Sequence, residues 1–128
     1  MKEKVEVLVN SLLDLPKEIM DLQTSALSVN EEIQKITDDI VLRENEIKTE
    51  INSATDESGK KLYSNEESRK IAFLNDSKTD ATLTKLYSSK KGADSQLQSI
   101  RIEIEMKSNV QRNLRSILGV LSGTYSDH

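Results

Sequence analysis

Apolar residues recur at alternating spacings of three and four along two long stretches of the chain. The first stretch contains Leu15, Ile19, Leu22, Ala26, Val29, Ile33, Ile36, Ile40 and Ile47, with Arg43 at one position of the pattern. The second contains Leu83, Leu86, Ala93, Leu97, Ile100 and Ile104, with Lys90 in the pattern. Such spacing is typical of helices that bury a narrow seam against another helix. The sequence therefore predicts an all-α protein with coiled-coil packing.

Turn formers and capping patterns divide the chain into shorter predicted elements. Asp14 and Pro16 suit the start of a helix, because Pro16 lacks an N–H that the first turn would leave unpaired. Ser64 and Glu67 have the spacing of a capping box at the start of another helix. We expect a single domain over 1–128, divided into a short helix (3–13), a long helix (15–52), a linker (53–65), a short helix (66–76), a long helix (79–121) and a frayed tail (122–128).

The charges of the two long helices are opposite in sign. Residues 31–57 hold nine acids and three bases, whereas residues 78–115 hold eight bases and four acids. Opposite charge favours pairing of the two helices with each other, and the short connection favours an antiparallel hairpin. A trial register places Ile47 opposite Leu86 and brings Arg43 within reach of Asp94.

A two-helix hairpin buries little surface, so we expect a second copy to complete a four-helix or larger bundle. The chain's first predicted partner is therefore itself, as a homodimer or higher oligomer. Near Lys107 and Gln111 the seam is expected to shift toward neighbouring apolar residues, as at a stutter. The positions expected to form the hairpin or oligomer seam are Ile19, Leu22, Val29, Ile33, Ile36, Ile40, Ile47, Leu86, Leu97, Ile100, Ile104, Val110, Leu114 and Ile117.

The composition argues against catalysis and cofactor binding. The chain has no cysteine, which excludes disulfides, thiolate metal sites and a cysteine nucleophile. The only histidine is His128 at the end of the chain, and the acidic residues show no spacing typical of metal ligands. We expect no enzymatic activity, cofactor or metal. No apolar stretch approaches the roughly 20 residues of a membrane helix, and the first residues do not resemble a signal peptide, so a cytoplasmic location is expected.

Large side chains and bases gather where the seam pattern fails. These tip residues are Lys60, Lys61, Leu62, Tyr63, Arg69, Lys70 and Phe73. One interpretation is a local plug that closes the end of the bundle. The other is a surface that binds a partner, because aromatic and arginine side chains are favoured interface anchors.

The segment from Thr55 to Arg69, TDESGKKLYSNEESR, resembles a linker found in small coiled-coil proteins of bacteriophages and prophages of Gram-positive bacteria. The later run QRNLR, from Gln111 to Arg115, resembles the end of their last helix. The resemblance covers roughly residues 30–118 and implies a long helix, a linker, a short helix and a second long helix. It also implies an accessory role in the host cytoplasm, such as binding or inhibiting a host or phage DNA-processing or defence enzyme. It assigns no catalytic residue.

The favoured function is a non-enzymatic module that binds an unidentified protein. One alternative is a nucleic-acid-associated factor in phage recombination or replication, although the net charge of −4 disfavours broad phosphate binding. The bases that would serve it are Lys90, Lys91, Arg101, Lys107, Arg112 and Arg115. A structural scaffold or spacer is the other alternative, since it needs only the hairpin.

Overall fold

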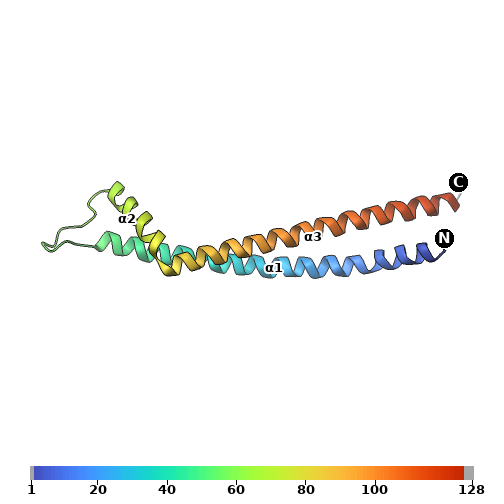
Figure 1. Ribbon diagram of the computed structural model, residues 1–128, viewed down its shortest axis with the longest axis horizontal. Coiled ribbons are helices and arrows are strands. Elements are labelled where there is room, and N and C mark those ends of the chain that lie inside the picture. The colour runs from blue at the N-terminus through green and yellow to red at the C-terminus, as the bar shows by residue number, and fades with distance from the viewer. Residues whose placement is uncertain (1, 126–128) are drawn as a thin grey trace. The chain divides into compact units, whose positions relative to one another are not determined.

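Three helices make up most of the protein. The computed structural model describes the backbone of residues 2–125 and the side chains of residues 2–121. The helices are α1 (Lys2–Ser53), α2 (Glu66–Thr79) and α3 (Ala81–Tyr125) (Figure 1). The predicted all-α fold is confirmed, and α1 packs against α3, as a hairpin requires. No helix in this described part is long and apolar enough to cross a membrane.

The backbone forms two compact units. Unit 1 combines Met1–Asn30 with Ser95–His128, and unit 2 is Glu31–Asp94. In unit 1 the start of α1 and the end of α3 lie at the same end, so the two helices are antiparallel (Figure 1). Its buried apolar side chains are Leu15, Val29, Leu97 and Leu114. The single domain expected for 1–128 stays a prediction.

Unit 2 contains the second half of α1, the linker, α2 and the first turns of α3. Its buried apolar side chains are Ile36, Ile40, Ile47, Ile51, Ala72, Leu83 and Ala93. Leu83 has no exposed surface, and Ala72 is the only buried residue of α2. The hydroxyl of Tyr87 on α3 donates a hydrogen bond of 2.8 Å to Glu44 on α1. Burial, followed by this bond to a carboxylate, raises the pKa of Tyr87 above its usual range.

The prediction of two helices separated near Pro16 is wrong, because α1 is continuous from Lys2 to Ser53 with Pro16 inside it. Val5, Leu8 and Leu12 are half-buried and continue the seam at the same spacing as Leu15. An interior proline costs a helix about 3 kcal/mol. Burying this continued seam offsets that cost, a contribution that local capping rules do not include.

The predicted shift of the α3 seam is also wrong. Twelve of the fourteen expected seam residues are buried or half-buried, whereas Val110 and Ile117 are exposed. Lys107 and Gln111 instead keep the three-four spacing on the less exposed side of α3. Lys107 can occupy the seam because its long apolar stem lies along the other helix while its charged end reaches the edge. A role for Val110 and Ile117 in an oligomer remains a prediction.

The ion pair at the edge of unit 1 also corrects the expected register. Nζ of Lys107 lies 3.0 Å from Oε2 of Glu18. In the trial register, with Ile47 opposite Leu86, Lys107 would lie level with α1 residues about eight positions after Glu18. That offset is about 12 Å along the helix, too far for this ion pair. A seam that repeats every seven residues buries similar side chains in neighbouring registers, so its spacing alone cannot choose among them.

Element boundaries also differ by a few residues around α2 and at the end of α3. This helix continues to Thr79, three residues beyond its expected end, and α3 begins at Ala81 rather than at 79. The tail expected to fray from 122 is helical through Tyr125. The remainder of that tail, 126–128, and with it His128, lies outside the described residues.

Candidate functional site

The linker between α1 and α2 folds into a small ordered turn. Thr55 and Lys61 form an isolated antiparallel bridge, and the amide of Leu62 donates to the carbonyl of Ala54 at 2.9 Å. Gly59 adopts a φ of 84°, a conformation that side chains with a Cβ disfavour. The sequence predicts a linker at 53–65, and within it Gly59 takes the left-handed conformation that this turn needs.

Asp56 holds this turn together through its carboxylate. Its Oδ1 accepts hydrogen bonds from the amide of Ser58 at 2.9 Å, the hydroxyl of Ser58 at 2.7 Å and the amide of Lys60 at 3.0 Å. The hydroxyl bond, followed by the bond from Lys60, lowers the pKa of Asp56 below its usual range. The carboxylate therefore serves the turn itself.

The start of α2 lies one residue later than the predicted capping box. Oδ1 of Asn65 accepts from the amide of Ser68 at 2.7 Å, and the Ser68 hydroxyl accepts from the amide of Asn65 at 3.4 Å. The expected pair, Ser64 and Glu67, is not the box. Both pairs have the required spacing, and the backbone entering the helix decides between them.

A groove lies between the last turns of α1 and the first turns of α2. Its volume is about 450 Å³. The residues that line it are Lys48, Ile51, Asn52, Glu66, Arg69, Lys70, Phe73 and Leu74. Three bases and one acid thus surround an apolar floor. Nζ of Lys48 lies 4.9 Å from the centre of the Phe73 ring, within the range of a cation–π interaction.

The structure brings together three of the seven predicted tip residues. Arg69, Lys70 and Phe73 line the groove, whereas Lys60, Lys61, Leu62 and Tyr63 do not. Nη1 of Arg69 donates to the carbonyl of Tyr63 at 3.4 Å and so ties the end of the linker to α2. Leu62 is 52% exposed in this single chain, and its part in a plug that closes a bundle stays a prediction.

Sequence reasoning missed the α1 side of this groove. Lys48, Ile51 and Asn52 were assigned to the last turns of a long helix, with no indication that α2 folds back beside them. Leu74 of α2, 57% exposed, was also missed. One sequence signal for this groove is the adjacent pair of large apolar residues, Phe73 and Leu74. A single seam buries only one of two adjacent helical residues, so the pair indicates that α2 contacts more than one neighbour.

Phe73 and Leu74 also border a second hollow, between α2 and the start of α3. It has a volume of about 530 Å³, and its other lining residues are Glu44, Ser77, Lys78, Thr84 and Tyr87. Phe73 and Leu74 therefore line both the groove beside α1 and this second hollow. Ile71 of α2 is also 53% exposed, so this helix carries exposed apolar side chains, as α1 does at Val41 and Leu42.

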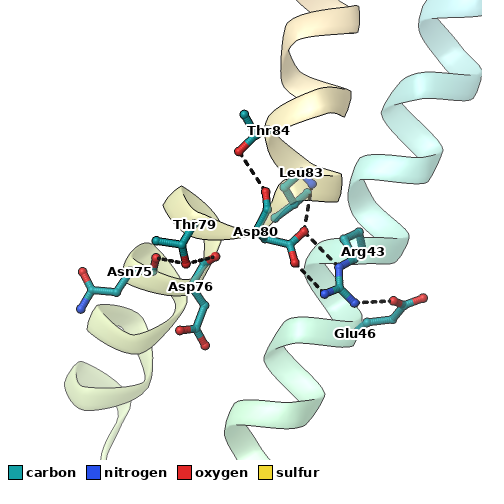
Figure 2. A network of polar contacts seen from close by, with 8 residues as sticks. All are labelled: Arg43, Glu46, Asn75, Asp76, Thr79, Asp80, Leu83 and Thr84. Carbon is teal, nitrogen blue, oxygen red and sulfur yellow. Dashed lines mark hydrogen bonds and ion pairs between the residues drawn. The ribbon is translucent and has the colours of Figure 1, made fainter.

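Asp80 fixes the position of α2 by joining three elements (Figure 2). Its carboxylate accepts two bonds from Arg43 of α1, at 2.7 Å and 3.2 Å, and one from the amide of Leu83 at 2.9 Å, as an N-cap of α3 does. Its own amide donates to the carbonyl of Asp76 in the last turn of α2. Arg43 also pairs with Glu46 at 2.9 Å. The predicted approach of Arg43 to Asp94 is wrong, because Asp94 pairs with Lys90 at 3.0 Å.

The contacts at this junction shift the pKa values of both Asp80 and Arg43. The bond from Arg43, followed by the bond from the Leu83 amide, lowers the pKa of Asp80 below its usual range. The bonds to Asp80 and then to Glu46 raise the pKa of Arg43 further above its usual range. Both groups therefore stay charged at neutral pH. They hold the groove's α2 wall at a defined position on α1.

Within the described residues, no three histidine, cysteine, aspartate or glutamate side chains gather in an arrangement able to hold a metal ion. The groove offers cations, one aromatic ring and aliphatic side chains, which suit binding of an acidic and partly apolar segment.

Comparison with known proteins found no matching family model, no similar curated protein and no similar solved structure.

Proposed function

We propose that this protein is a non-enzymatic protein-binding module whose contact surface is the groove between α1 and α2. The single observation that carries the proposal is the lining of that groove, in which Lys48, Arg69 and Lys70 surround Phe73 and Leu74. The proposed partner presents an acidic segment with at least one large apolar side chain.

The charges of the groove support an acidic partner. Lys70 pairs with Glu66 at 3.5 Å, but both side chains are more than 70% exposed, so this pair holds the lysine weakly. Lys48 lies over the ring of Phe73 and has no carboxylate partner among the ion pairs of the described residues. An acidic segment would supply the opposite charge to both lysines.

The apolar residues of α2 support a partner that also contributes apolar contact. Burying a large exposed side chain such as Leu74 contributes about 1–2 kcal/mol. Aromatic side chains in partly formed pockets, like Phe73 here, are frequent binding anchors. Charge then orients the partner, and apolar burial holds it.

The resemblance of residues 55–69 to a phage linker sets the biological context of the proposal. We propose an accessory protein that binds or inhibits a host or phage protein, such as a DNA-processing or defence enzyme, in the cytoplasm of the host cell.

Selection of peptides from a random library on the immobilised full-length chain tests the proposal. Selected peptides should combine acidic residues with a large apolar residue. Their affinity should fall by about tenfold or more for Lys48→Glu with Lys70→Glu, and for Leu74→Ser, at unchanged helicity. Lys35→Glu with Lys85→Glu is the matched control, because both lysines are exposed in unit 2 away from the groove. Peptides without this composition, or peptides that bind all variants equally, would refute the groove as the binding site.

The nucleic-acid alternative is less favoured by the contacts of the basic helix. Of its six candidate bases, Lys90 pairs with Asp94, Lys107 pairs with Glu18, and Arg112 donates to Asn109 at 2.8 Å. These contacts occupy half of the bases that would meet phosphates. Retention of the chain on DNA that falls steeply with salt would support the alternative over the groove.

A further inference from the structure

Helix α1 carries a second apolar stripe in unit 1, beside the seam that packs on α3. Leu13, Met20 and Leu27 lie seven residues apart and are 71%, 59% and 61% exposed. Val9 and Pro16 are also exposed, and they lie before Leu13 and between Leu13 and Met20, respectively. With Gln23 they complete a run at the same three-four spacing as the buried seam, rotated about 100° around the helix.

The three-four spacing of the stripe suits packing against another helix. A run of positions three and four apart presents a straight edge to another helix that crosses at a shallow angle. The stripe extends over residues 9–27, about 27 Å of helix. The positions one step farther around the helix are Asn10, Asp14, Lys17, Asp21, Thr24 and Ser28. Of these, the column nearest the stripe, Asn10, Lys17 and Thr24, carries one charge per chain, and Asp14 and Asp21 lie farther round. A weakly charged border favours a protein neighbour over water.

We propose that the stripe Val9–Leu27 of α1 binds the same stripe of a second copy of this chain, antiparallel, around a two-fold axis near residue 18. The residues of the stripe are spaced by four, three, four, three and four positions, which is the same order from either end. Two antiparallel copies of the stripe can therefore align residue against residue. Val9 then faces Leu27 of the second copy, and Pro16 faces Met20. Closed two-fold pairs of this kind are the commonest arrangement of identical chains. The inference does not depend on the proposed groove, which lies in unit 2.

A second exposed stripe, on α3, provides the control. Met106, Val110 and Ile117 are exposed on the side of α3 rotated from its seam in the opposite sense to the α1 stripe. Because the helices are antiparallel, stripes rotated in opposite senses lie on opposite faces of unit 1. A copy bound through α1 therefore leaves Met106 and Val110 uncovered.

Sedimentation equilibrium of the full chain measures the association. The wild-type chain should show twice the single-chain mass in the micromolar range. Leu13→Lys with Met20→Lys should raise the dissociation constant by about a hundredfold or more, at unchanged helicity. Met106→Lys with Val110→Lys should leave it unchanged within about threefold. A wild-type monomer at about 200 µM, or dissociation by the α3 pair instead, would overturn the proposal.

Cysteine cross-linking tests the orientation, and it remains informative if a lysine variant fails to fold. The natural chain has no cysteine, so each introduced thiol is the only one present. A mixture of Pro16→Cys and Met20→Cys chains should form the mixed disulfide faster than either variant forms its own. Self-linked products that dominate would indicate parallel helices and refute the antiparallel pair.

Discussion

Replacement of Leu83 by alanine should destabilise the protein more than truncation of any other leucine. Leu83 has no exposed surface, and it lies in the first turn of α3, where that helix meets the core of unit 2. Leucine to alanine removes three carbons, or about 2.5 kcal/mol of transfer free energy at 0.8 kcal/mol per carbon. The cavity left behind adds to this loss, so we expect a total of about 3–4 kcal/mol.

Urea unfolding followed by circular dichroism at 222 nm measures this loss. Typical domains have an unfolding free energy of about 5–15 kcal/mol, so the midpoint should fall markedly. Leu42→Ala is the matched control, because Leu42 belongs to the same unit and is 61% exposed. All chains should be compared at one concentration, since self-association would couple to stability.

The predicted loss at Leu83 follows from its complete burial near the junction of α2 and α3. A loss below about 1.5 kcal/mol for Leu83→Ala, or one equal to that of Leu42→Ala, would refute it. Either result would mean that the start of α3 separates from the core at little cost. The position of α2, and with it the shape of the groove, would then not be fixed by this packing.

Three further changes test other parts of the structure. Pro16→Ala should stabilise the chain by about 2 kcal/mol in urea unfolding, because the interior-proline cost exceeds the gain in unfolded-chain entropy; a loss of stability would indicate that Pro16 starts a separate helix. The lowered pKa of Asp80 means that its charge stabilises the fold above about pH 4, and that this contribution is lost as pH falls through the lowered value. Asp80→Asn, which can still cap α3, should therefore lose less stability than wild type between pH 7 and pH 3, and equal losses would contradict the role of Arg43. Gly59→Ala should lower the stability by about 1 kcal/mol, because a φ of 84° disfavours a residue with a Cβ. Amide hydrogen exchange should become faster in the turn around Asp56 at unchanged helicity, and slower exchange there would refute this prediction.

The continuity of α1 shows how a local rule can be overridden by packing. Proline and a preceding aspartate are typical of a helix start, and nothing near Pro16 contradicts that interpretation. The seam residues on both sides of it, Leu12 and Leu15, nevertheless face the same way only if the helix continues. Burial along the whole seam outweighs one missing hydrogen bond. The result is one helix of 52 residues.

The candidate site was predictable only in part, for a related reason. Arg69, Lys70 and Phe73 belong to one helix, so their common location follows from the helical period. Lys48 and Ile51 join them because α2 folds back along α1, and that path is set by Asp80 with Arg43, residues 37 positions apart. No local pattern contains a bond of such separation.

The sequence by itself determined the all-α class, the antiparallel pairing of the two long helices and the break in helix between α1 and α2, because each follows from apolar spacing, charge or backbone preference along the chain. Only the tertiary structure decided the register, the continuity through Pro16 and the two walls of the groove. Seven-residue repeats leave several registers nearly equal in buried surface. The choice among them depends on specific contacts between distant residues, such as Glu18 with Lys107 and Arg43 with Asp80.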